Sequence, residues 1–540
     1  MAGFLLSSKA HARFCPYLAV STFYAMASLM LPQTAHALAP AISAQPVSQA
    51  VLPGSNATFI VTAASPPLAY QWRFNGGNVS GATNSALTIT NVQTASTGTY
   101  TVVITNASGV VTSSPATLAL ATAPDFLWAR NVTNGASPSY PGYSYADHVA
   151  ADHLGNVFVA GMFFGGSPAS IDFGGSGLTN IGGARAGYFI CKYDRSGNFA
   201  WARQVATNSA DTPRLRLATD STGNVYFVGR FTDSAIFGTH TLVSSGSIAL
   251  FLAKYNSQGE ALWVRQINAY DPNLIAALAL AIGSNANVFI SAAYTNNVDV
   301  GGMVISNSAS FLAKYDSAGN LAWAKPAVAA EALAVGLTGS IYTTGGTRYS
   351  PTPFAGTIAK YDSVGNLVWS RLFPHGRCIV VDAAENIYAT GMGIGTFDDI
   401  TMTNANGADF VIARYDSAGQ LKWFHQAGST NQPFGMGMGL DAFGNIYATA
   451  STGTGRRDPV LTFGSSTLTN TYSFLVKYDP AGNALWAVAP GGTNNAPPFC
   501  LTLVNHEEIY LAGKFKSQAP FGNFNLFDSN PMSYSDFYLA

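Results

Sequence analysis

The feature that most constrains this chain is a ten-residue pattern that recurs along most of its length. Its clearest copy is Lys-Tyr-Asp-Arg-Ser-Gly-Asn-Phe-Ala-Trp at residues 192–201, with further copies at 254–263, 314–323, 360–369, 414–423 and 477–486. A second pattern, Asp-His-Leu-Gly-Asn-Val-Phe-Val-Ala-Gly, lies at 152–161 and returns near 220–229, 283–292, 336–345, 382–391, 441–450 and 504–513. Each copy predicts a strand, a tight turn and a strand, because the Asp carboxylate caps the turn and the Gly accepts a positive φ.

One copy of each pattern supplies four antiparallel strands, which is the unit of a β-propeller blade. Counting the blades depends on the two ends of the repeat region. Trp128 has no Lys-Tyr-Asp strand before it, and the last such strand, at 536–540, has no Trp strand after it. Pairing of 536–540 with 126–130 would complete a seventh blade and remove an open strand edge. We therefore predict a seven-bladed β-propeller at residues 123–540, closed by its N- and C-terminal strands.

The repeats resemble the bacterial secreted β-propeller repeat family (SBBP-like repeats), which is found in surface-associated proteins beside immunoglobulin-like domains. This resemblance implies a fold and an exported location, but it implies no particular activity. The turn spacing is also similar to quinoprotein repeats and to the Asp-box of sialidases. Seven blades and the lack of adjacent cysteines argue against a quinoprotein, and no Arg triad can be assigned for a sialidase. No cofactor is predicted.

Residues 38–122 read as a small β-sandwich. Short alternating strands are expected at 57–62, 68–74, 86–89, 99–105 and 110–118. Trp72 and Tyr100 match the buried Trp and the corner Tyr of the immunoglobulin superfamily, so this segment resembles an I-set-like domain. Val61 and Val102 stand where that family has its two cysteines, and the resemblance therefore implies a domain without the inter-sheet disulfide.

Residues 1–37 are predicted to be a signal peptide. Lys9, His11 and Arg13 precede an apolar stretch at 14–31, and the small-residue site at 35–37 suits cleavage before residue 38. The alternative is an uncleaved anchor, because about 18 apolar residues can span a bilayer. Cleavage predicts a secreted or cell-surface protein with no membrane span in its mature chain.

Charge and cysteine usage exclude several classes of function. The formal net charge is -1, only 10% of residues are charged, and no Lys/Arg-rich run is present, so no nucleic-acid partner is expected. Cys191, Cys378 and Cys500 have no zinc-site spacing and are expected to be buried small side chains. No metal site and no catalytic residues are predicted.

Aligning the innermost predicted strand of each blade identifies one candidate site. The positions at the start of this strand, which we expect at the mouth of the central channel, carry polar or charged residues in several blades. Together with aromatics of the preceding loop they form a hypothetical ligand-binding set: Asp147, His148, Arg214, Arg216, Glu331, Arg377, Tyr143 and Tyr145. The alternative is that these charges line a water-filled channel or pair with one another.

Two functions of different classes follow. The favoured one is an exported, non-catalytic binding, adhesion or surface-recognition protein, whose propeller binds an extracellular glycan or a surface protein. The alternative is an exported carbohydrate-active enzyme, a glycoside hydrolase or lyase, acting at the channel mouth. Glycoside hydrolysis needs two carboxyl groups about 5–10 Å apart, whereas Asp147 and Glu331 are three blades apart. A purely structural cell-envelope component is a third possibility.

Overall fold

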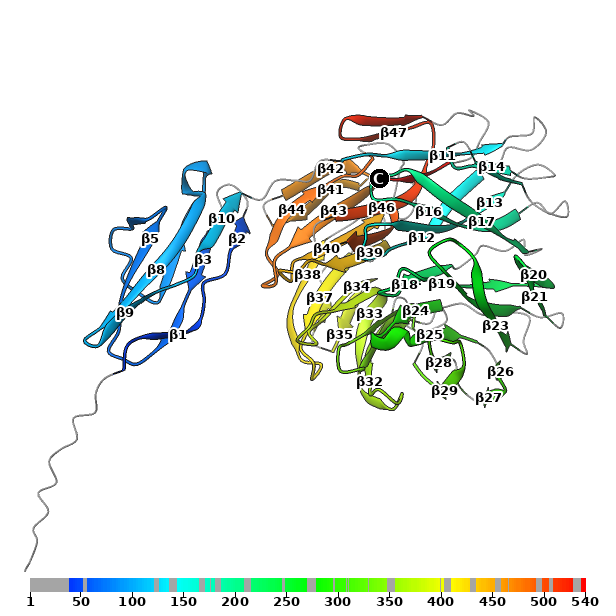
Figure 1. Cartoon of the computed structure of the whole chain (residues 1–540), viewed down its shortest axis with the longest axis horizontal. Helices are drawn as coiled ribbons and strands as arrows, with labels where there is room; N and C mark the ends of the chain where they lie inside the picture. The colour runs from blue at the N-terminus through cyan, green and yellow to red at the C-terminus, as the bar shows by residue number, and fades with distance from the viewer. Residues whose placement is uncertain are drawn as a thin grey trace, which may run out of the picture. The chain divides into compact units, whose positions relative to one another are not determined.

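The computed structural model describes residues 38–540 except for a number of short segments. The segments left out are 52–55, 121–125, 136–142, 165–169, 175, 180–185, 208–214, 245–247, 270–277, 295–296, 307, 309, 329, 347–354, 399, 403–408, 428–433, 452–457, 465, 492–497, 505–507 and 528–535. The regular elements of the described residues are strands and short 3-10 turns, which confirms the all-β fold class (Figure 1). No described helix is long and apolar enough to cross a membrane. The signal peptide predicted at 1–37 lies outside the described residues.

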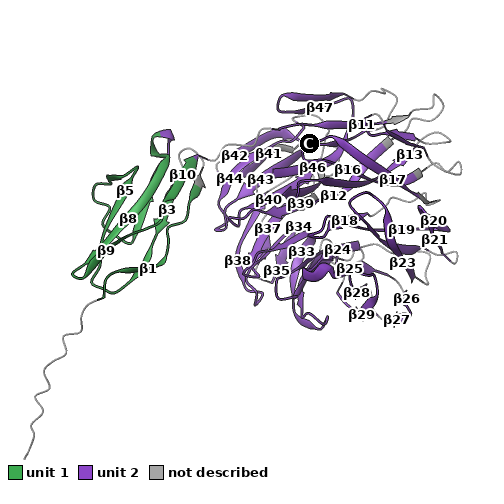
Figure 2. Ribbon diagram, viewed as in Figure 1, with its two compact units in different colours: residues 1–49, 56–91, 95–119 green, residues 50–55, 92–94, 120–540 purple. Residues whose placement is uncertain are grey.

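The chain divides into two compact units (Figure 2). The first contains most of the residues up to 119, and the second contains residues 120–540. The strands of the first unit are β1 (Ala41–Ala44), β2 (Gln49–Val51), β3 (Ala57–Ile60), β4 (Thr62–Ala64), β5 (Ala69–Phe74), β6 (Gly77–Asn78), β7 (Ala86–Ile89), β8 (Gly98–Asn106), β9 (Gly109–Thr112) and β10 (Ala116–Leu120). They pair in the order β2-β10-β8-β5-β6 with β9 on β8, and as the separate pairs β1-β4 and β3-β7.

The core of the first unit forms around Trp72, which is fully buried and lies opposite Val102 in the β5-β8 register. Its indole Nε1–H donates to the Asn84 carbonyl at 2.9 Å, so the buried polar atom is satisfied. Tyr100 donates its hydroxyl to the Ser96 carbonyl at 2.9 Å, which confirms the expected corner bond. Val61 and Val102 are both buried, as expected for apolar residues at positions that hold cysteines in disulfide-bonded relatives.

The second unit repeats one strand order, in which four antiparallel strands follow one another in space. These groups are β12 (Tyr143–Ala151), β13 (Val157–Phe164), β16 (Ala186–Tyr193) and β17 (Phe199–Thr207); β18 (Arg216–Thr219), β19 (Val225–Phe231), β22 (Ala249–Tyr255) and β23 (Ala261–Ala269); β24 (Leu278–Ile282), β25 (Val288–Ala293), β28 (Ser310–Tyr315) and β29 (Leu321–Pro326); β30 (Ala332–Val335), β31 (Ile341–Gly346), β32 (Ala355–Tyr361) and the first half of β33 (Leu367–Val381); the second half of β33 with β34 (Ile387–Gly393), β37 (Asp409–Tyr415) and β38 (Leu421–Ala427); and β39 (Phe434–Leu440), β40 (Ile446–Ser451), β43 (Ser473–Tyr478) and β44 (Ala484–Val488).

Short outer hairpins accompany these sheets, in some cases as added strands of the same sheet. They are β14 (Ser170–Asp172) with β15 (Gly177–Thr179), β20 (Ser234–Phe237) with β21 (His240–Val243), β26 (Asn297–Val300) with β27 (Met303–Ser306), β35 (Gly395–Phe397) with β36 (Ile400–Met402), β41 (Asp458–Phe463) with β42 (Ser466–Thr471), and β47 (Gln518–Phe521) with β48 (Phe524–Phe527).

A further sheet of the same order combines the two ends of the second unit. It consists of β45 (Pro498–Val504), β46 (Glu508–Phe515), β49 (Asp536–Leu539) and β11 (Arg130–Gly135), with the C-terminus beside β46 and β11 (Figure 1). Arg130 lies opposite Leu539 in this pairing. The N-terminal partner strand therefore begins at Arg130, a few residues later than the 126–130 segment expected from the repeat, and the strand pairing itself is present.

The repeated turns have the chemistry expected from their sequence. The Asp194 carboxylate accepts hydrogen bonds from the backbone N–H groups of Ser196 at 2.9 Å and Asn198 at 2.8 Å. Its second oxygen accepts one from the Asn198 side chain at 2.9 Å, and Gly197 has a φ of +75°. These bonds satisfy backbone donors inside the turn, and Gly197 takes the left-handed conformation without a steric cost.

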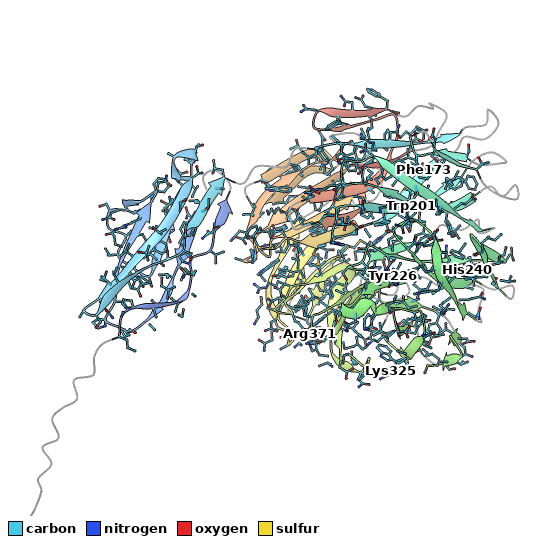
Figure 3. The ribbon with its side chains drawn as sticks, viewed as in Figure 1. Phe173, Trp201, Tyr226, His240, Lys325 and Arg371 are labelled. Carbon is cyan, nitrogen blue, oxygen red and sulfur yellow. The ribbon has the colours of Figure 1, made fainter. Side chains whose placement is uncertain are left out.

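The repeated tryptophan joins each sheet to the next one. Trp201, labelled in Figure 3, donates Nε1–H to the Ser257 carbonyl at 3.0 Å and covers Gly259. A Cβ atom on Gly259 would lie 2.8 Å from the Trp201 ring, so the stack requires glycine. Arg203, two residues after the Trp, donates to the Gly259 carbonyl at 2.8 Å. The same combination joins Trp128 and Arg130 to Gly197, Trp263 and Arg265 to Gly319, and Trp369 and Arg371 to Gly419.

Candidate functional site

A cavity of about 500 Å³ lies among the first strands of the sheets in the second unit. These strands contact one another in succession, namely β12 with β18, β18 with β24, β24 with β30, β30 with β33, β33 with β39 and β39 with β45, and β45 contacts β12 in turn. Five residues predicted for the ligand-binding set line this cavity: Asp147, His148, Arg216, Glu331 and Arg377. The structure thus brings together side chains that are up to 230 residues apart (377 − 147) in the chain.

Three other residues of the predicted set are not placed at this cavity. Arg214 lies outside the described residues, and Tyr143 belongs to β12 but its side chain is not described. Tyr145 packs against the apolar cluster that contains Met162 and Leu215 and is not among the residues that line the cavity. An aromatic ring on this strand gains more from burial against apolar neighbours than from facing a polar cavity.

Irregular strand pairing explains why adjacent residues of one strand both reach the cavity. In β12, Ala146 lies opposite Gly161 and His148 lies opposite Ala160, so Asp147 is an extra residue without a counterpart in β13. Arg377 is the extra residue at the corresponding place in β33. A β-bulge of this kind re-aims a side chain that regular alternation would direct to the other face. The bulge therefore places Asp147 beside His148 in the lining.

Glu331 is the centre of a buried charge cluster. Its carboxylate accepts from the Arg377 guanidinium and lies 2.9 Å from Nε2 of His375. All three side chains are at most 16% exposed, so the Glu331–Arg377 ion pair is largely removed from water. Each charge needs its partner, because an uncompensated buried charge is strongly destabilising. For Glu331 and Arg377, the alternative that the predicted charges pair with one another is therefore correct.

His375 was missed by the alignment of innermost strands. It lies three residues before Cys378 in β33, outside the positions compared among the blades. It supports Glu331 but is not part of the cavity lining. No pattern in the repeat marks this position.

Asp147 and His148 are fixed by backbone groups of the neighbouring sheet. The Asp147 carboxylate accepts from Leu215 N at 2.5 Å, and Nδ1 of His148 accepts from Leu217 N at 3.3 Å. Burial, reinforced by the nearby Arg216 charge, lowers the pKa of His148 from 6.5 to about 3. His148 is consequently a neutral imidazole at neutral pH, and because its Nδ1 is an acceptor its proton is on Nε2.

Arg216 differs from the other charged residues of the lining. Its Nη1 donates to the Leu215 carbonyl at 2.8 Å, and among the described residues no carboxylate lies within 4.0 Å of its guanidinium nitrogens. Its charge lowers the pKa of Cys378 and of Cys500, which belong to two other sheets, although burial is the larger effect on each thiol. The guanidinium therefore acts across the cavity rather than within one sheet.

The remaining lining near Arg216 is small and uncharged. Ala279, Ala332 and Gly437 occupy the position equivalent to Arg216 in three sheets, and Cys378 and Cys500 occupy it in two others. Burial raises the pKa of the Cys378 thiol to about 11, and it raises the pKa of Cys500 as well, so both groups are protonated at neutral pH. All three cysteines are free; Cys191 and Cys500 are buried as predicted, whereas Cys378 is only partly buried. Among the described residues no cluster of His, Cys, Asp or Glu could hold a metal ion.

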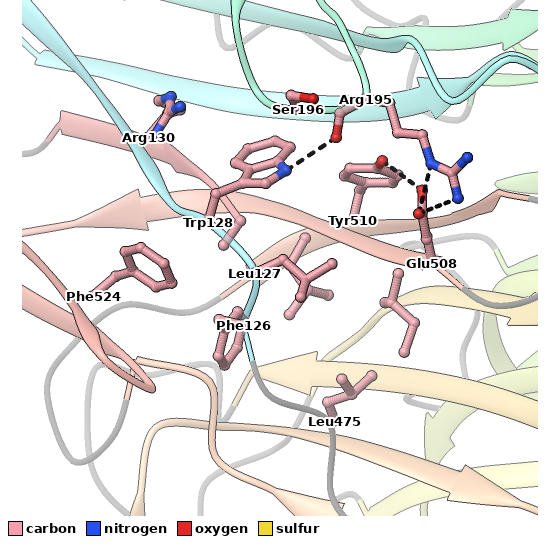
Figure 4. Close-up of a pocket in the computed structure, with 13 residues that line it drawn as sticks. Phe126, Leu127, Trp128, Arg130, Arg195, Ser196, Leu475, Glu508, Tyr510 and Phe524 are labelled. Atoms are coloured by element: carbon pink, nitrogen blue, oxygen red, sulfur yellow. Dashed lines mark hydrogen bonds and ion pairs between the residues drawn. The ribbon is translucent and has the colours of Figure 1, made fainter.

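A second cavity, of about 650 Å³, lies where β11 and β46 meet the turn at residues 195–196 (Figure 4). Trp128 and Tyr510 line it, with ring centroids 5.7 Å apart. Glu508 accepts from the Tyr510 hydroxyl at 3.0 Å and from Arg195 Nε at 2.7 Å. Trp128 donates to the Arg195 carbonyl, as the repeat tryptophans Trp201 and Trp263 donate to a turn of the next sheet, so its role here is packing between sheets.

Comparison with known proteins identifies the first unit more firmly than the second. Residues 39–106 match the model of the immunoglobulin domain. The regulatory protein FlaEY of Caulobacter vibrioides is 29% identical over 115 residues, which are 21% of this chain and only 12% of that protein.

Solved structures give weaker likenesses. Rhamnogalacturonan lyase YesW aligns with 84% of this chain and 78% of its own at 11% identity, with a TM-score of 0.31. The N-terminal four immunoglobulin domains of Dscam1 align with 70% of this chain and 96% of their own at 11% identity, with a TM-score of 0.16. Neither TM-score is high enough to indicate a shared overall fold. The chain therefore contains an immunoglobulin-like domain at residues 39–106 within an all-β protein.

Proposed function

We propose that residues 123–540 form a seven-bladed β-propeller, preceded by the immunoglobulin-like domain at 38–122 and a signal peptide at 1–37. The support is the recurrence of one four-strand order in seven groups of described strands, the last of which combines β45, β46 and β49 with β11. The succession of contacts among the first strands returns from β45 to β12, as it must if the blades surround a central channel.

The function we propose is recognition of a ligand at this central channel by an exported or cell-surface protein. One observation carries the proposal: the charged and polar side chains of four separate sheets converge on one cavity of about 500 Å³, in a chain with only 10% charged residues. Ligand sites are commonly concave and combine an apolar wall with a few convergent polar groups. The ligand would be an extracellular glycan or a surface protein, with the immunoglobulin-like domain as spacer or adhesion module.

The carbohydrate-active enzyme is the less favoured alternative. Glu331 already holds Arg377 and His375, and Asp147 already accepts from Leu215 N. The two carboxylates thus serve to position neighbouring groups in this structure.

A steric block of the channel tests the proposal. Ala332 lines the cavity, so a larger side chain at this position would reduce the cavity volume. Ala332→Phe should therefore weaken ligand binding at least about tenfold. Thr241→Phe, at an exposed position of β21, is the matched control. Binding would be measured with the full chain on arrays of glycans and of surface proteins. Retained binding by Ala332→Phe, or no binder on either array, would contradict recognition at the channel.

A further inference from the structure

The charged residues of the cavity lining differ in the partners that they have. Glu331 and Arg377 form one ion pair, and Asp147 is bonded to a backbone N–H of the adjacent sheet. Arg216 has no described carboxylate within ion-pair distance. It therefore offers one positive charge to whatever enters the cavity.

His148 is the neighbour of Arg216 that can donate a hydrogen bond to a ligand. His148 uses Nδ1 as an acceptor from Leu217 N, which leaves Nε2–H as its remaining polar group. Cys378 and Cys500 are protonated thiols, so they add no negative charge to the wall, and the Cys500 S–H already donates to the Ala512 carbonyl at 3.6 Å. A ligand group that accepts several hydrogen bonds and carries a negative charge matches this lining.

Space for such a group exists because several residues of the lining are small. Ala279 and Gly437 occupy the positions equivalent to Arg216 in their own sheets, and a Cβ atom at Gly437 would lie 2.6 Å from Leu501 N. Gly437 thus keeps the wall thin where the first strands of two sheets meet. The cavity volume of about 500 Å³ is within the usual range of small-ligand sites, about 300–1,000 Å³.

We propose that the channel recognises its ligand through one carboxylate group, bound by the Arg216 guanidinium with His148 Nε2–H beside it. A planar guanidinium offers two parallel N–H donors that fit the two oxygens of a carboxylate. A monoanion places one negative charge against the Arg216 guanidinium, whereas a phosphate dianion would add a second one near Glu331 and Asp147. This inference rests on the proposed recognition function and specifies its ligand class.

The carboxylate has two chemical sources, a sugar acid or the C-terminus of a peptide. Calorimetric titration of the full chain would use D-glucuronate against D-glucose for the first source. It would use N-acetylalanine against N-acetylalanine amide for the second. We expect one acid to bind at least about tenfold more tightly than its neutral counterpart, because hydrogen bonds to charged groups are the stronger ones.

Arg216→Gln should abolish this discrimination between acid and neutral compound, and Arg216→Lys should retain part of it. Arg73 belongs to the first unit and donates an exposed hydrogen bond to Asn78. Arg73→Gln should leave the discrimination unchanged, and it controls for the loss of one positive charge. Urea unfolding of each variant checks that the fold persists, and His148→Gln offers a second test of the same site if Arg216→Gln does not fold. Equal discrimination in wild type and Arg216→Gln would overturn the carboxylate site.

The two levels of the proposal fail in different ways. If an array ligand binds in an Ala332-dependent manner but neither acid binds, the carboxylate assignment is wrong and channel recognition stands. If no array ligand and no acid binds, recognition at the channel fails together with it.

Discussion

Burial of His148 makes the stability of the second unit depend on pH in a defined way. Its pKa is about 3 in the folded chain and 6.5 when exposed, so between these values the unfolded chain binds a proton that the folded chain does not. Stability contributed by the neutral imidazole is therefore present above pH 6.5 and is lost as the pH falls. Integrating the proton linkage gives a loss of about 2 kcal/mol of unfolding free energy between pH 7 and pH 5.

The variant His148→Asn isolates this contribution. Asn Oδ1 can replace Nδ1 as the acceptor for Leu217 N, but it does not titrate. Urea unfolding at pH 7 and pH 5 would be followed by tryptophan fluorescence, which reports mainly on the second unit because seven of the eight tryptophans lie there. The wild type should lose about 2 kcal/mol more than the variant on acidification. His153→Asn, at an exposed turn position, controls for loss of one histidine. Equal losses in wild type and His148→Asn would refute the reasoning.

Three further predictions concern the framework. Gly259→Ala should destabilise the second unit by about 2–4 kcal/mol in urea unfolding, because the residue has a left-handed φ and its new Cβ overlaps the tryptophan ring. Gly238 has a φ of +60° and open space around it, so Gly238→Ala should cost only the conformational part, about 1 kcal/mol. Equal costs for the two variants would contradict the stacking. Asp220→Ala should lower the urea midpoint by the equivalent of about 3 kcal/mol, since it removes the cap and a buried ion-pair partner together; Asp220→Asn, which retains one acceptor oxygen, should be milder. Tyr100→Phe should cost the first unit about 1 kcal/mol by removing the bond to Ser96, as seen by faster hydrogen exchange confined to that unit.

The repeated turns could be read from the sequence because each depends on residues that are adjacent in the chain. Asp194 and Gly197 define their turn with local hydrogen bonds and one positive φ, so four residues contain the whole signal. The roles of Trp72 and Tyr100 in the first unit were predictable for another reason, because the two residues match a motif of the immunoglobulin superfamily that the segment resembles.

The site was only partly predictable. Asp147, His148 and Arg216 were found because they interrupt an apolar template at equivalent positions. The pairing of Glu331 with His375 depends on how two sheets meet, and no local pattern encodes it. Bulge positions are equally hidden, since one extra residue changes the direction of a side chain without changing the composition.

The repeat also contains a cation at a fixed distance from its tryptophan. An arginine follows the repeat tryptophan by two residues in several copies, as at 203, 265 and 371, and each donates to the carbonyl of the glycine under that tryptophan. A lysine at 325 takes the equivalent place and donates to Asn366 instead. The recurrence of a cation at a fixed offset from an aromatic ring indicates contact with a following repeat, which a comparison of copies could have identified.

The unbroken course of β33 links two sheets mechanically. Its first half is the outer strand beside β32, and its second half is the strand beside β34, with no loop between them. Because no loop joins the two halves of β33, ordering one sheet after the other has no additional loop-closure cost. Neither sheet can unfold without removing a strand from the other. They should open as a single cooperative block. Because Arg377 lies in this shared strand and lines the cavity, the framework that the two sheets share also holds its backbone in place.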